Sequence, residues 1–330
     1  MISRVAETCF WLNRYVERVE TLARMLDVNL SMQLDVDLPS DRWLPLVVVT
    51  GQGEPYRAGP GGGTPDDPER VQTYLTWDDE NPSSILRSLA AARENARTIR
   101  ETISLEMWEV LNDLWIWIHG KPARRLWERD RHAFYVYLRD RSLLFHGVAM
   151  ATMLHEDPFE FSRLGTSLER FEQAARVLDV KYESIGPTSP DQESPEEVAQ
   201  WLATLRFCSG VEPFFKRGDQ VLSGRAVADF LLFDEAFPRS VMHNLQRCRN
   251  FLMLVLPPPP SPVGAASLRL IDRALADLHG RSIDDILESG LHETLNGIVA
   301  TAAELGAQIR RDFFEPEAVL SGASQSQSQA

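Results

Sequence analysis

The sequence predicts an all-α protein, a helical bundle formed by tandem duplication of one multi-helix unit. Apolar residues recur at three- and four-residue steps through long segments, which is the spacing of one helical face. Three blocks of the first half also return in the same order in the second half, and such a repeat indicates two copies of one structural unit. Alternation of apolar and polar residues, which is typical of strands, nowhere extends far.

The first block is the segment ERVETLARMLDV at 17–28, which returns as ERFEQAARVLDV at 169–180 with eight of twelve positions identical. Both copies carry an apolar stripe at helical spacing, so we expect one long helix to open each half. The stripes consist of Leu12, Val16, Val19, Ala23 and Leu26 in the first copy and Leu164, Leu168, Phe171, Ala175 and Leu178 in the second.

The second block, WLPLVVVTGQGEPY from Trp43, corresponds to WLATLRFCSGVEPF from Trp201. Its run at 47–49 resembles a strand, but the counterpart LATLRF is at least as helical. The third block follows a Pro-Ser pair, which predicts a helix cap near Ser83 or Ser84 and a helical run from Ile85 to Trp117. This block pairs Leu75, Asp78, Pro82, Ser84, Leu89 and Arg93 with Leu231, Asp234, Pro238, Ser240, Leu245 and Arg249.

Glycine and proline clusters place the boundaries of the two units. We expect a first helical unit at 1–155, with a Gly/Pro-rich loop inserted at about 51–68, and a second unit at 156–316. In the second unit, 186–195 is the analogue of the loop and 257–260 forms a stiff proline spacer. Residues 317–330 contain few apolar side chains and read as a disordered tail. A length of 330 residues gives each unit room for a core of its own.

Composition and motif content exclude several functional classes. The net charge of −14 argues against nucleic acids and anionic membranes as partners. Three cysteines without a Cys-x-x-Cys spacing favour reduced thiols, and no apolar run approaches the length of a membrane span, so a cytoplasmic protein is expected. The sequence contains no zinc-protease motif, phosphate loop or nucleophile elbow, and we therefore expect neither a metal nor a cofactor.

The charged face of the two opening helices is the candidate functional feature. Taken alone it reads as a solvated face with weak salt bridges. However, both copies retain the Glu-Arg pair, which indicates that these charges meet something specific: either each other across the two units, or a ligand between them. A buried network would be chiefly structural, whereas an open cleft could hold carboxylate or phosphate. The candidates are Arg14, Glu17, Arg18, Glu169 and Arg170, with Arg93 and Arg249 as complements of the two glutamates and Arg97 extending the cluster.

These segments resemble the alpha-E family, a predicted alpha-helical family named for its Glu-Arg motif. The resemblance covers roughly residues 1–315 and rests on FWLNRYVERVETLARMLDV at 10–28, SILRSLAAARENARTIRETISLEMWEVLN at 84–112, LGTSLERFEQAARVLDVKY at 164–182 and ADFLLFDEAFPRSV at 228–241. Genes of the family typically lie beside, or are fused to, genes for a circularly permuted ATP-grasp protein, often with a transglutaminase-like peptidase nearby. The resemblance thus implies a system that forms and cleaves amide bonds.

Three functional hypotheses follow. The leading one is a non-catalytic accessory subunit that binds an ATP-grasp-type amide ligase or its peptide substrate. The alternative is an enzyme that acts on an anionic substrate in a cleft between the units, with Glu17 or Glu169 as acid/base and arginines as anchors. Carboxylates beside arginines have lowered pKa values, which suit anchoring better than acid catalysis. The third is a scaffold whose charged helices form a dimer surface.

Overall fold

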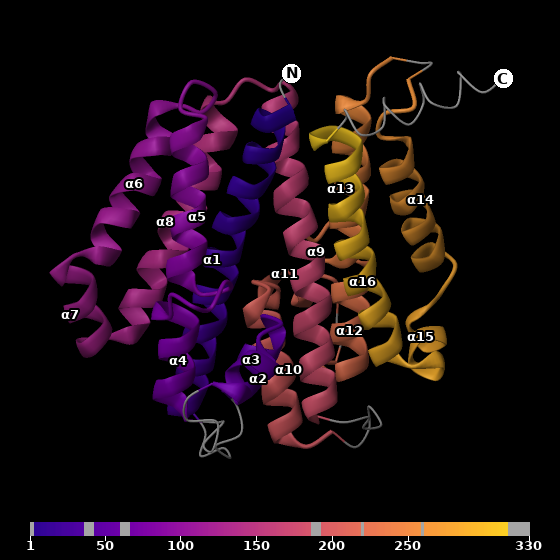
Figure 1. Ribbon diagram of the computed structural model, residues 1–330. Helices are drawn as coiled ribbons and strands as arrows, with labels where there is room; N and C mark the ends of the chain where they lie inside the picture. The colour runs from indigo at the N-terminus through magenta and orange to yellow at the C-terminus, as the bar shows by residue number, and fades with distance from the viewer. Residues whose placement is uncertain are drawn as a thin grey trace.

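The computed structural model describes residues 3–35, 43–59, 67–185, 193–218, 221–258 and 261–315. Within these residues the regular elements are helices and no strand occurs, which confirms the predicted all-α class (Figure 1). No helix among the described residues combines the length and apolar character needed to cross a membrane.

The helices of the first half run from Ser3 to Thr152. They are α1 (Ser3–Asp35), α2 (Leu44–Val49), α3 (Gly53–Ala58), α4 (Pro68–Trp77), α5 (Ile85–Thr98), α6 (Leu105–His119), α7 (Lys121–Arg129) and α8 (Arg131–Thr152).

The helices of the second half follow in a similar order of lengths, with a π-helical turn at the end. They are α9 (Asp157–Ile185), α10 (Pro195–Phe207), α11 (Val211–Phe215), α12 (Gly224–Phe233), α13 (Val241–Val255), α14 (Ala265–His279), α15 (Ile283–Ser289), α16 (Leu291–Ile309) and η2 (Arg310–Phe314). The predicted unit boundary at 155/156 falls between α8 and α9. The tandem duplication and the unit limits stay predictions.

The two long helices α1 and α9 lie side by side at the centre of the bundle (Figure 1). Helices α5 and α8 pack on α1, while α13 and α16 pack on α9. Short helices cross between the halves, since α2 contacts α9 and α10 contacts α1. The central helices approach closely at Gly165, where an added Cβ would lie 2.3 Å from the carbonyl oxygen of Phe10. Both central helices are therefore covered on nearly every side.

Some contacts between helices recur at corresponding places in the two halves. Nδ1 of His132 on α8 lies 2.6 Å from Asp27 on α1, and Nδ1 of His292 on α16 lies 2.7 Å from Asp179 on α9.

We call two residues matched when they occupy the same place in the two series of helices. The offsets are 152 residues for α1 and α9, 156 for the loop before α5 and α13, and 160 for α6–α8 and α14–α16.

The predicted cap at Ser84 is confirmed, because its side chain accepts a hydrogen bond from the backbone N–H of Arg87. The run from Ile85 to Trp117 is not one helix, however. Helix α5 ends at Thr98 and α6 begins at Leu105, because the hydroxyl of Ser104 accepts the N–H of Met107 and starts a new helix. The strand-like run at 47–49 belongs to helix α2.

The segment expected to be a loop at 51–68 is helical at both ends. Gly53–Ala58 forms α3, whose Tyr56 is buried, and Pro68 begins α4. The guanidinium of Arg70 stacks over the Tyr56 ring at 4.3 Å, so α3 is fixed against α4 by packing that its composition did not reveal. Residues 60–66, most of the analogous segment at 186–195 and the predicted tail lie outside the described residues.

Candidate functional site

The charged face of α1 is buried. Glu17 and Glu20 are fully buried and Arg14 nearly so, although the helix taken alone reads as a solvated face. The reason is the central place of α1: its apolar stripe faces helices of its own half, and its charged face lies against α9. Charges buried in this way are stable only when each has a partner of opposite sign.

The two Glu-Arg pairs exchange partners across the halves. The Glu17 carboxylate accepts two hydrogen bonds from Arg170, with Nε to Oε1 and Nη2 to Oε2 both 2.9 Å. The Glu169 carboxylate likewise accepts Nε and Nη2 of Arg18, at 2.8 and 3.1 Å. Each two-pronged pair joins α1 to α9, and neither carboxylate is exposed to solvent. Two parallel hydrogen bonds between a guanidinium and a carboxylate form a strong ion pair.

Two further side chains complete the surroundings of Glu17. Nη1 of Arg239 lies 3.0 Å from Oε1, and Nε2 of His146 lies 3.2 Å from Oε2. The same Arg239 donates through Nη2 to Glu20 at 2.6 Å, and Glu20 also pairs with Arg24 one turn along α1. Arg239 thus bridges two buried carboxylates of α1 from the loop before α13.

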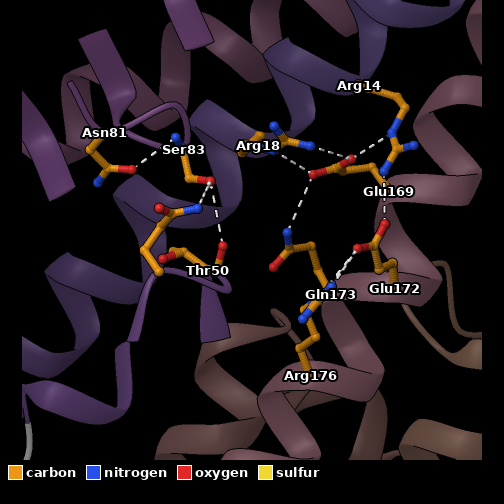
Figure 2. Close-up of polar contacts among 10 residues, drawn as sticks. Arg14, Arg18, Thr50, Asn81, Ser83, Glu169, Glu172, Gln173 and Arg176 are labelled. Atoms are coloured by element: carbon orange, nitrogen blue, oxygen red, sulfur yellow. Dashed lines mark hydrogen bonds and ion pairs between the residues drawn. The ribbon is translucent and has the colours of Figure 1, made fainter. Parts of the chain in front are cut away.

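Glu169 has a different second cation (Figure 2). Nε of Arg14 donates to Oε2 of Glu169 at 2.7 Å, and its Nη2 donates to Glu172 at 2.7 Å. Arg176 holds the other oxygen of Glu172 at 3.0 Å, and the Gln173 amide donates to Glu169 at 3.3 Å. Arg14, on the neighbouring central helix α1, therefore bridges the carboxylates of Glu169 and Glu172.

The arginines dominate the protonation of both glutamates. Burial alone would raise the pKa of Glu17, but Arg170 and Arg239, with His146, hold this pKa well below its ordinary value. Burial likewise opposes ionisation of Glu169, yet Arg18 and Arg14 lower its pKa to about 2. Both groups are therefore charged at neutral pH and have no proton to donate.

Three predicted site residues lie elsewhere. Nε of Arg93 donates to Asn112 on α6 at 3.0 Å, and matched Arg249 donates to Asp272 on α14 at 2.6 Å. Arg97 pairs with Glu94 in solvent. The prediction that Arg93 and Arg249 complement the two glutamates is wrong. Helix α5 turns the small Ala92 and Ala96 inward, and α13 turns Cys248 and Leu252 inward at the matched places, so the arginines face outward.

Several further residues of the network were not among the predicted site residues. Glu20 and Glu172 repeat at the same offset as the Glu-Arg pairs, so the internal comparison contained a signal for them. Arg239 and His146 gave no such signal, because their matched residues are Ser83 and Gly306. The guanidinium of Arg14 lies beside Gly306, 3.6 Å from where its Cβ would be.

Two cavities adjoin this framework. One of about 90 Å³ lies between α1 and α9 beside Arg18 and Arg176. A larger one of about 400 Å³ opens between α9, α13, α14 and α16, with Phe171, Leu245, Asp277, Glu293 and Gly297 in its wall. Among the described ranges, no three His, Cys, Asp or Glu side chains are arranged to hold a metal ion.

Comparison with known proteins adds the family. Three curated relatives, one from Mycobacterium bovis and two from strains of Mycobacterium tuberculosis, are each 25% identical over 317 residues and carry the description uncharacterized protein. The match covers 90% of this chain but 35% of each relative, so the chain spans about a third of their length. No solved structure gives a significant match. Residues 1–314 match the Alpha-E family, described as a predicted alpha-helical domain with a conserved ER motif, and the chain belongs to that family.

Proposed function

We propose that this chain is a non-catalytic accessory subunit that binds a circularly permuted ATP-grasp-type amide ligase or its peptide substrate. The proposal rests on one observation: the carboxylates of the Glu-Arg pairs are already bound by guanidinium groups of this chain. Each glutamate is fully buried and held by guanidinium groups of the other half, so these residues join α1 to α9. The family resemblance supplies the ligase as partner.

The alternative, an enzyme with Glu17 or Glu169 as acid/base, receives little support from this geometry. A general acid or base needs a pKa near the working pH and room for a substrate within hydrogen-bond reach. Both carboxyl groups have strongly lowered pKa values, and their oxygens already accept hydrogen bonds from arginine. They suit a structural role better.

The cavity of about 400 Å³ supports the binding role. Its volume lies in the range of small-molecule and side-chain pockets, and its wall combines apolar residues with the charged Asp277 and Glu293. At matched places in the first half, the large rings of Trp117 and Tyr137 pack against each other with centroids 4.2 Å apart. The second half has Asp277 and Gly297 there and is open.

The length of the curated relatives is consistent with a subunit role. In each of them the matching region is part of a much longer chain, as is expected for a module that works beside other domains. In this proposal the chain positions peptide substrate for the ligase, and the ligase carries out the ATP-dependent chemistry.

The test uses the ATP-grasp protein of the same organism, purified alone and mixed with this chain. We expect the two to co-elute in gel filtration and the chain to increase peptide-dependent ADP release. Gly297→Tyr should fill the large cavity and abolish the increase while co-elution persists. Gly147→Tyr is the control, since an added Cβ meets nothing within 4 Å at either glycine. Separate elution together with unchanged ADP release would contradict the proposal.

A further inference from the structure

The small cavity between the central helices has a wall of polar groups drawn from both halves (Figure 2). Helix α1 contributes its wall on one side, α9 on the other, and the chain around α2 and before α5 closes it. The polar side chains of the wall are Arg18, Thr21, Thr50, Ser83, Gln173 and Arg176, with Glu172 at the edge.

The matched place in the other half carries a longer side chain. Ser83 is matched to Arg239, whose guanidinium bridges Glu17 and Glu20. Around the cavity the matched carboxylates, Glu169 and Glu172, are bridged instead by Arg14. Ser83, with its short side chain, lines the cavity at the place matched to Arg239.

The charges around the cavity do not balance. Three guanidiniums, those of Arg14, Arg18 and Arg176, meet two carboxylates, those of Glu169 and Glu172, which leaves one positive charge in excess. Arg14 and Glu169 are buried, and the side chains of Arg18, Glu172 and Arg176 are partly buried. An uncompensated charge is costly where contact with water is reduced in this way. A ligand that enters this space should bind most favourably if it carries one negative charge.

Hydrogen-bond donors also remain. Thr21 is 5% exposed, and its hydroxyl has no partner among the described residues. Arg18 and Arg176 each bind a carboxylate through Nε and Nη2, which leaves Nη1 of each for another acceptor. An unsatisfied buried hydroxyl is uncommon in folded proteins and calls for a ligand or a bound water.

We propose that this cavity binds a small carboxylate, with Thr21, Arg18 and Arg176 as its donors. A volume of about 90 Å³ equals the space of about three water molecules, which suits a group of the size of acetate. The side chains of Arg18 and Arg176 are 21% and 29% exposed, so the carboxylate of a larger molecule enters beside them. A monoanion matches the single excess charge better than phosphate does. This inference stands independently of the proposed ligase partner.

The test is a calorimetric titration of the full chain with sodium acetate, at an ionic strength held constant with sodium chloride. We expect saturable binding of one acetate per chain. Thr21→Val keeps the shape of the side chain but removes the hydroxyl, and should weaken the affinity by about tenfold or more. Arg176→Gln removes a charge and should weaken it further.

Arg24→Gln is the matched control for Arg176→Gln. Arg24 occupies the matched position on α1 and pairs with Glu20, but does not line the cavity. It should leave the affinity for acetate unchanged. The proposal is overturned if acetate shows no saturable binding, if phosphate binds more tightly than acetate, or if Thr21→Val leaves the affinity unchanged.

Discussion

Replacing Glu17 by Gln removes the carboxylate that Arg170, Arg239 and His146 share. Arg170 binds both of its oxygens, Arg239 lies 3.0 Å from one and His146 lies 3.2 Å from the other. A glutamine side chain fills nearly the same space, so packing is retained, but the buried guanidiniums lose their counter-charge. Breaking a buried ion pair on one side costs about 3–5 kcal/mol. We expect a loss of that size in the free energy of unfolding.

The loss is measured by urea unfolding at pH 7, followed by far-UV circular dichroism. Glu94→Gln is the control, because Glu94 forms its pair with Arg97 in solvent and should give no measurable change. If Glu17→Gln unfolds at the same urea concentration as the wild type, Glu17 is not a buried structural charge and the network is misassigned.

The remaining predictions concern pH, packing and thiol reactivity. Because the pKa of Glu169 is about 2 in the folded protein against an ordinary 4.5, the unfolded chain binds more protons between these values. The free energy of unfolding should therefore fall as pH drops from about 5 to 2, and Glu169→Gln should flatten this fall. Gly165→Ala should cost about 1–3 kcal/mol in urea unfolding, since its Cβ would collide with the backbone of α1, whereas Gly147→Ala should cost nothing. Burial raises the pKa of Cys9 to about 12 and also raises those of the other two thiols, so none should react with a thiol reagent until urea is added.

The helical class was predictable because local spacing determines it. Every residue of the two predicted apolar stripes, the one that begins at Leu12 and the one that ends at Leu178, is buried in the core. Breaks inside a favourable run were not predictable in the same way. The start of α6 at Leu105 depends on Ser104 as its cap, and several other serines in the chain could have served as caps.

The site was predictable to the extent that it repeats. Arg18 and Arg170 were found because the internal comparison preserves them, and the structure places each on the glutamate of the other half. Arg239 and His146 occur in one half alone, so no internal signal marks them. The error over Arg93 has a different cause: a repeated arginine shows that a contact recurs, but not which helix it contacts. Here the recurring contact joins neighbouring outer helices.

The small cavity could not be predicted from any single residue. Ser83 lines it at the place where the other half has an arginine, and a serine in a loop before a helix is usually read as a cap. Only the positions of α1, α9 and the loop before α5 show that Ser83 lies in the wall of a cavity beside two arginines.

The exchange of partners between the two Glu-Arg pairs is tested most directly by double-mutant cycles that start from Glu17. One cycle combines Glu17→Gln with Arg170→Gln, and the other combines it with Arg18→Gln, the neighbour in sequence. The structure predicts a coupling energy above about 1 kcal/mol for Glu17 with Arg170, because the two side chains share two hydrogen bonds. For Glu17 with Arg18 it predicts a much smaller value, because Arg18 binds Glu169. A larger coupling with Arg18 than with Arg170 would contradict the exchanged pairing.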